Sequence, residues 1–340
     1  TGYGITTLLF LNEINQNNIF IEKAESAARW LIENALHPSC GFKTRSYYSR
    51  ADEEEIYSFD NGRIFSFDTG MIILGLINLY KETGNEELLK ISINSADFLI
   101  KKMQKDDGSF HTAYDPNTSE PINALDKWSS QSGSYHAKIA LSLLKLYEIT
   151  NSRDLKNRVI RLCDSSLKLQ ERDGRFSSFS NSGNTHQHPH IYSVEGLLHV
   201  GVNLGIEKYK KAATDAIIWT LNNQLSTGGI PQLYYKDRNT FNKNERVDVN
   251  AQVLRSSIIL RSLGYLSKEY DKNIKALLNR LLEFQNFSND KQYGGFYFGN
   301  DHDGVNLNHI NSWCTMFSLQ ALIYYNQFTS GKKLDHKFLI

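Results

Sequence analysis

The sequence is poor in cysteine and in net charge, and each shortage argues against a class of protein. Its 340 residues contain three widely spaced cysteines, Cys40, Cys163 and Cys314, which disfavours a disulfide scaffold and predicts buried free thiols. Lys and Arg number 38 against 37 Asp and Glu, so no net field attracts nucleic acid or a membrane surface. No apolar run approaches the roughly 20 residues that span a membrane. We therefore expect neither a nucleic-acid partner nor a membrane span.

Proline is also scarce, with five residues in the chain, which suits long helices. The chain begins at Thr1 without a signal-like segment, which suggests a processed or trimmed N-terminus and leaves the compartment open. What the sequence does contain is 40% hydrophobic residues, enough for a substantial core, and 12% aromatic residues, which serve cores and sugar-binding clefts alike.

A short motif recurs along the chain. Gln104 to Phe110 and Gln170 to Phe176 both read Gln-x3-Gly-x-Phe, and a third copy from Gln224 ends in Ile. A fourth copy from Gln285 has a longer insert, and the glutamines are 66, 54 and 61 residues apart. Such a period indicates one supersecondary unit repeated along the chain.

Each copy follows an amphipathic helical pattern with a single apolar stripe, which is typical of an outer helix. Between these lies a second set of segments that are apolar on most faces and are expected as buried inner helices. We place these at 3–14, 68–80, 134–147, 192–204, 248–263 and 311–325. Alternating inner and outer helices predict an all-α protein, an (α/α)6 toroid forming a single domain over residues 1–340. An open helical solenoid is the alternative.

The connections between these helices are unequal. Those from an inner to an outer helix are short, whereas those from an outer to an inner helix are long, at about 37–66, 105–131, 171–190, 225–247 and 286–309. Long loops in compact domains tend to carry function. In a toroid they share one edge with the N-termini of the inner helices, which favour bound anions. We expect the site there.

The repeat resembles that of the toroid superfamily, which includes terpenoid cyclases, protein prenyltransferases, six-hairpin glycoside hydrolases, polysaccharide lyases and uronyl epimerases. The segment from Asp68-Thr-Gly-Met to Tyr80-Lys-Glu-Thr-Gly84 resembles an inner helix and turn of unsaturated-uronyl hydrolases. That resemblance implies a catalytic role for Asp68. The Asp-rich motifs of cyclases and the zinc ligands of prenyltransferases have no clear match.

Carboxylates at the long connections are the first candidates for chemistry. Glycoside hydrolysis needs one protonated acid and one carboxylate, and Asp68 and Asp115 come from consecutive units. Asp60, Arg63 and Asp248 are candidate substrate-binding residues nearby. The alternative for Asp68 and Asp248 is a plain N-cap, a position that Asp favours.

Histidines form the second candidate set. Thr185-His186-Gln-His188-Pro-His190-Ile-Tyr192 alternates histidines in the predicted loop. Here His190 and Tyr192 are candidates for proton transfer or sugar orientation and His188 for substrate binding, with surface or capping roles as the alternative. We expect neither a metal site nor a cofactor. The remaining candidate substrate-binding residues are His111, Trp128, Tyr135, His136, Arg255, His309, Asn311 and Trp313. Arg255 has an internal ion pair as its alternative, and the aromatic residues have core or loop packing.

The sequence thus predicts a carbohydrate-active enzyme that cleaves a glycosidic bond in an acidic, uronate-containing glycan, with hydrolysis as the first choice. The second is a polysaccharide lyase or uronyl C5-epimerase that uses His and Tyr for proton transfer. An isoprenoid cyclase-like protein and a non-catalytic glycan-binding toroid are further alternatives. The sugar, the linkage and the oligomeric state are not determined by the sequence.

Overall fold

A computed structural model describes residues 1–44, 62–123, 127–288, 291–301, 303–305, 307, 309–334 and 337–340. The chain divides into two compact units, Thr1–Ser166 with Phe338–Ile340, and Leu167–Lys337, and each is described by itself. The single toroid domain over residues 1–340 stays a prediction. None of the helices in the described ranges has the length and apolar character needed to cross a membrane.

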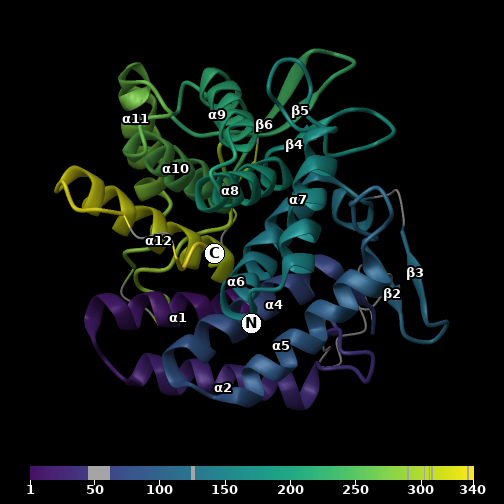
Figure 1. The fold of residues 1–340 in the computed structure, drawn as a ribbon. Helices are drawn as coiled ribbons and strands as arrows, with labels where there is room; N and C mark the ends of the chain where they lie inside the picture. The colour runs from purple at the N-terminus through teal and green to yellow at the C-terminus, as the bar shows by residue number, and fades with distance from the viewer. Residues whose placement is uncertain are drawn as a thin grey trace. The chain divides into compact units, whose positions relative to one another are not determined.

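The first unit consists of paired helices with short helical turns between them (Figure 1). Helix α1 packs against α2 and α4, and α4 also packs against α5 and α6. The helices are α1 (Gly2–Asn15), α2 (Ile19–Asn34), α4 (Ser66–Thr83), α5 (Glu86–Phe98), α6 (Ala140–Thr150) and α7 (Arg153–Leu167). The π-turn η1 (Leu99–Met103) extends α5, while the 3-10 turns η2 (Trp128–Ser130) and η3 (Ser134–Ile139) precede α6.

The second unit repeats the pairing. Helix α8 packs against α9, and α10 packs against α8, α9, α11 and α12. The helices are α8 (Gln187–Leu204), α9 (Glu207–Asn222), α10 (Val247–Ser262), α11 (Asp271–Glu283) and α12 (Ser312–Thr329), with the 3-10 turn η4 (Lys268–Tyr270) before α11.

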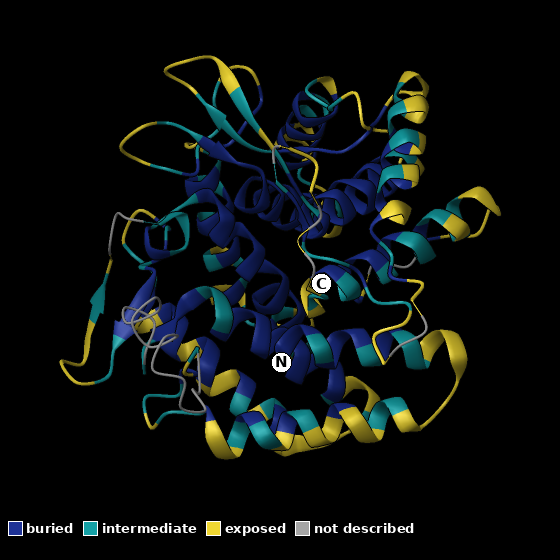
Figure 2. Cartoon of the chain, turned by 180° about the vertical axis from the view of Figure 1, so that it is seen from behind, coloured by how far each residue is buried: buried dark blue, intermediate teal, exposed yellow. Residues whose placement is uncertain are grey.

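Burial separates the helices into the two predicted classes (Figure 2). In α8 and α10 nearly every residue is buried, whereas α2 and α11 bury a single stripe. Helix α12 differs from the prediction, because it too buries one stripe rather than most of its faces. The other expected inner helices lie within a few residues of their predicted bounds, except at the N-terminus of α8 and where η3 replaces the first turns of the segment 134–147.

The long connections are not bare loops, because they contain short strands that join them into two antiparallel sheets. The first unit has β1 (Ile64–Phe65), β2 (Ala113–Asp115) and β3 (Glu120–Ile122), with Ile64 opposite Tyr114. The second has β4 (Thr185–His186), β5 (Pro231–Tyr235), β6 (Thr240–Arg246) and β7 (Gly299–Asn300), in that order. Within each unit the outer-to-inner connections therefore lie side by side.

The repeated motif holds each connection to the next outer helix. The Gln170 Nε2 donates to the carbonyl of Gly174 (2.8 Å) and to that of Ala212 in α9 (2.9 Å). Gly174 has a φ of 97°, and a Cβ there would lie 2.8 Å from the Asp215 carbonyl oxygen. The copies at Gln104 and Gln224 make the same pair of bonds. The motif is therefore structural, since only glycine combines this φ with so close a backbone.

Candidate functional site

The predicted carboxylates of the first unit lie at the start of α4 and the end of β2. Asp68 is in the first turn of α4 and is half-buried, but the N-cap residue is Phe65, so Asp68 does not occupy the N-cap position. Asp115 Oδ2 lies 3.8 Å from Arg63 Nη2, because β1 pairs with β2. An opposed pair of Asp68 and Asp115 stays a prediction, and Asp60 lies outside the described residues.

Aromatic side chains gather next to Asp68. The Tyr135 ring lies 5.6 Å from Phe67, 5.3 Å from Trp128 and 4.1 Å from the His136 imidazole, between ring centroids. Its hydroxyl donates to the Gln131 carbonyl at 3.2 Å. Burial, ahead of any nearby charge, raises the pKa of Tyr135. Tyr135 is therefore a phenol fixed in its protonated form rather than a proton acceptor.

In the second unit, helix α8 begins at Gln187, so the predicted start at Tyr192 and the predicted loop to residue 190 are wrong at this boundary. His186 is the N-cap residue, and its ring accepts from the His188 backbone N–H at 3.2 Å. Pro189 fits because a proline in the first helical turn forfeits no intrahelical hydrogen bond. His188, His190 and Tyr192 therefore lie on a helix, where i and i+4 residues share a face.

His190 is an internal link of the repeat. Its Nδ1 accepts from the Phe176 N–H at 3.0 Å, and its Nε2 lies 3.1 Å from Thr220 Oγ1. Burial lowers the pKa of His190 to about 3, so the ring is neutral. Asn250 takes the same role in the next repeat, accepting from the Ile230 N–H. With no exposed surface and both nitrogens occupied, His190 is placed for a structural role rather than for contact with a sugar.

His188 lies beside a buried ion pair. Its Nδ1 is 3.3 Å from Asp248 Oδ2, and Asp248 accepts from Arg246 Nε (3.1 Å) and Nη2 (2.6 Å). Burial by itself would raise the pKa of Asp248, but the charges of Arg246 and His188, together with hydrogen bonds from Arg246 and the Val249 N–H, outweigh it and the pKa falls to about 2. Asp248 is therefore an anion at neutral pH. It lies inside the first turn of α10, whose N-cap residue is Arg246, so it is not an N-cap either.

Tyr192 follows His188 by one helical turn and completes this cluster. The two rings are 4.4 Å apart in an edge-on arrangement, and both side chains are almost fully buried. His186, also at the start of α8, has its pKa held well below the usual value by burial and then by the charge of Arg246. We refer to His186, His188, Tyr192, Arg246 and Asp248 as the His–Asp cluster.

The predicted role of Arg255 in substrate binding is wrong. Its guanidinium donates to Glu195 Oε1 from Nε at 2.7 Å and to Gln320 Oε1 at 3.0 Å, and no part of the residue is exposed. A substrate carboxylate has no access to it. The structure bears out the alternative of an internal ion pair.

The residues predicted around the start of α12 take separate places. Asn311 is the N-cap of α12 and accepts from the Trp313 and Cys314 N–H groups, whereas Trp313 is 49% exposed. His309 is exposed and stacks on Phe298 at 5.2 Å. Phe298 also lies 5.0 Å from the Arg246 guanidinium, which links His309 to the edge of the His–Asp cluster.

Two residues of this cluster, Arg246 and His186, are not among the predicted site residues. Arg246 precedes Asp248 by two residues at the junction of β6 and α10, a spacing that brings both side chains together once the strand turns into the helix. His186 was visible as the first of the alternating histidines, but its capping role depends on where α8 begins. Over the described residues, no group of three or more His, Cys, Asp or Glu is arranged to hold a metal ion.

The sequence matches no protein-family model and no curated protein. Its fold, however, is shared with solved structures over nearly the whole chain. A sugar epimerase from a ruminal bacterium has a TM-score of 0.77 at 11% identity, covering 98% of this chain and 87% of that one. The cellobiose 2-epimerase of Spirochaeta thermophila has a TM-score of 0.77 at 14% identity, covering 97% and 85%. An unsaturated glucuronyl hydrolase specific for heparin has a TM-score of 0.67 at 13% identity, covering 97% and 86%. The chain therefore has the fold of the (α/α)6 toroid, as the repeat predicts, and not that of an open solenoid.

Proposed function

We propose that this protein is a carbohydrate-active enzyme that moves a proton at a sugar carbon next to a carbonyl group, as an epimerase or isomerase does. The observation that carries the proposal is the contact between His188 and the anionic Asp248. Likeness in fold to proteins named sugar epimerase and cellobiose 2-epimerase supports it. This choice puts proton transfer ahead of the hydrolysis that the sequence favours.

The cluster has the parts that such a reaction needs. A neutral imidazole accepts the proton as the C–H bond breaks, and the electron pair moves into an enediolate whose oxygen takes the charge. Asp248, next to the Nδ1 of His188, stabilises the imidazolium that forms and orients the ring. Arg246 keeps Asp248 ionised and in place. Tyr192 is the candidate donor that returns a proton, with His186 as a second hydrogen-bond donor.

The test is proton exchange with solvent. The protein is incubated in D2O with a panel of reducing sugars and uronates, and NMR follows loss of the hydrogen next to the carbonyl. We expect exchange on at least one sugar, lowered by a factor of about 100 or more in His188→Gln and in Asp248→Asn, the usual size of a general-base effect. His37→Gln, a half-exposed histidine of the first unit, is the matched control.

Hydrolysis of an acidic glycan is the second candidate, with Asp68 and Asp115 as the carboxylate pair. The observation favouring it is the aromatic group of Phe67, Trp128 and Tyr135 next to Asp68, since aromatic faces stack on sugar rings. Likeness in fold to unsaturated glucuronyl hydrolases supports it. The same panel separates the candidates. New reducing ends lost in Asp68→Asn, without deuterium uptake, would replace the first proposal, whereas new ultraviolet absorbance lost in Tyr192→Phe would indicate a lyase.

A further inference from the structure

The imidazole of His136 has a buried N–H that meets no acceptor among the described residues. His136 lies in η3, is 1% exposed, and accepts at Nδ1 from the Gly133 N–H at 3.4 Å. A neutral ring that accepts at Nδ1 has its proton on Nε2. That Nε2 is buried and has no hydrogen-bond partner in the described part of the chain. Because a buried donor without an acceptor destabilises the fold, it is suited to an acceptor that a ligand supplies.

A second histidine of the first unit, the partly exposed His111, also has its ring proton on Nε2. The Asn123 side chain accepts from the Thr112 N–H at 3.0 Å, which turns its amide nitrogen toward His111 Nδ1 at 3.4 Å. His111 therefore accepts at Nδ1 and has its proton on Nε2. Partial burial, followed by the charge of Lys105, lowers the pKa of His111, which keeps the ring neutral.

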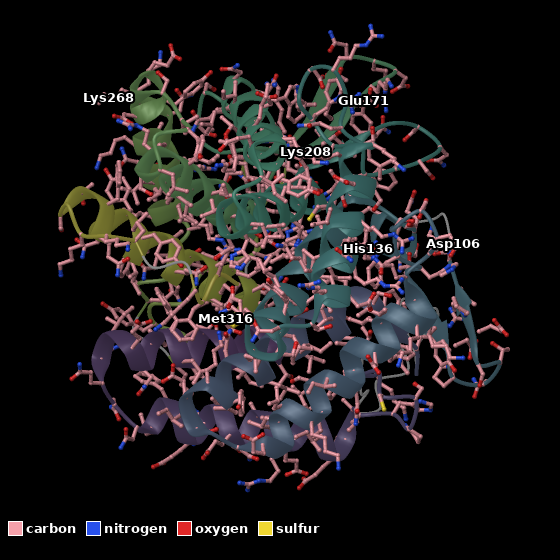
Figure 3. The ribbon with its side chains drawn as sticks, viewed as in Figure 1. Asp106, His136, Glu171, Lys208, Lys268 and Met316 are labelled. Carbon is pink, nitrogen blue, oxygen red and sulfur yellow. The ribbon has the colours of Figure 1, made fainter. Side chains whose placement is uncertain are left out.

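The charge of one cation, Lys105, acts on both rings. Lys105 Nζ donates to Ser132 Oγ at 3.1 Å, and Ser132 adjoins the Gly133 that holds His136. Burial and then the charge of Lys105 lower the pKa of His136 to about 3, so the imidazole is neutral. The carboxylate of Asp107 partly opposes this effect, because its negative charge raises the pKa of His111. The adjacent Asp106 lies at the surface, whereas His136 lies further inside (Figure 3).

We propose that Lys105, His111 and His136 form a binding site for an anionic oxygen group of a sugar ligand, either a carboxylate or a phosphate. An ammonium and two imidazole N–H groups are all donors, and an anionic oxygen accepts from all three. Lys105 supplies the charge, and the two rings, each with its Nδ1 occupied, supply directional hydrogen bonds. The proposal does not depend on the reaction of the His–Asp cluster, because its test is a binding measurement.

The test is calorimetric titration of the full chain with inorganic phosphate, glucuronate and glucose. We expect at least one anion to bind, glucose to bind more weakly, and the affinity for the anion to fall tenfold or more in Lys105→Met and in His136→Phe. Lys102→Met is the matched control, because Lys102 is an exposed lysine of η1 and the charge change is the same.

The two anions identify the group. Tighter binding of glucuronate assigns the site to a sugar carboxylate, and tighter binding of phosphate assigns it to a phosphate group. Lys105 is half-exposed, so Lys105→Met keeps the fold and decides the question even where His136→Phe does not. The proposal is overturned by binding of neither anion, by equal binding of glucose, or by an equal loss of affinity in Lys102→Met.

Discussion

Three histidines that follow one another along the sequence take up different chemistry because of where their ring nitrogens lie. His186 caps a helix, His188 faces a carboxylate, and His190 bridges a loop amide and an outer helix. Their alternation in the sequence identified the segment as a candidate site but did not show what each histidine does. A role depends on the partner of each nitrogen, and those partners lie as far away as Asp248.

At the same scale, the buried pair of Arg255 and Glu195 gives a stability prediction. Arg255→Met leaves the Glu195 carboxylate unpaired in the interior, and we expect a loss of about 3–5 kcal/mol in the free energy of unfolding. Urea denaturation measures it. The control is Arg261→Met, whose partner Asp271 is exposed, with an expected loss of about 0–1 kcal/mol. Equal losses in the two variants would show that burial of the ion pair does not increase the cost of removing its arginine.

At the scale of elements, the motif Gln-x3-Gly-x-Phe is explained by backbone contacts between successive repeats. The glutamine amide ties its own loop to the next outer helix, and the glycine lets that helix approach. The histidine, asparagine or threonine in the first turn of the following inner helix accepts from the loop amide, as His190, Asn250 and Thr315 do. This explains why the motif repeats in a chain whose connections otherwise differ.

The close approach predicts a graded response to alanine at two glycines. Gly174 and Gly205 both have positive φ, but among the described residues only Gly174 has a neighbour, the Asp215 carbonyl oxygen at 2.8 Å from an added Cβ. We expect Gly205→Ala to lose about 1–2 kcal/mol of stability from backbone strain alone. Gly174→Ala should lose about 1–3 kcal/mol more because of overpacking. Thermal or urea unfolding compares the two, and equal losses would contradict the packing argument.

At the scale of the whole molecule, the chain buries histidines that must stay neutral. Burial lowers the pKa of His136 and of His190 to about 3, well below the ordinary value near 6.5. Below pH 6.5 the unfolded chain binds a proton at each that the folded chain does not. Their contribution to stability is therefore complete above pH 6.5 and falls as the pH drops toward 3.

This linkage predicts a loss of stability that begins near pH 6, above the ordinary pKa values of carboxylates. Each histidine should lower the free energy of unfolding by about 1.4 kcal/mol per pH unit between pH 6 and 4. Urea denaturation at several pH values measures the slope. The variant His190→Asn copies the acceptor used at Asn250. In it, the slope of the free energy of unfolding against pH should decrease by the contribution of one histidine. An unchanged slope would mean that His190 is not neutral in the folded chain.

The sequence by itself determined the helical class, the order of inner and outer helices and the positions of the long connections. These depend on local periodicity and on a motif whose partners recur at fixed spacing, so they can be read along the chain. Asp68 was singled out from the sequence because it lies at the start of an inner helix, and His188 and Tyr192 because they belong to the segment of alternating histidines.

Only the tertiary structure decided what each polar side chain meets. Arg255 and Arg246 are both arginines, yet they have different partners. Arg255 forms a buried ion pair with Glu195, whereas Arg246 binds Asp248 next to His188. Within the described ranges the Nε2 of His136 meets no acceptor, whereas His190 has both nitrogens occupied. The physical reason is that hydrogen bonds and ion pairs between distant residues depend on packing, which brings together side chains that no sequence spacing relates.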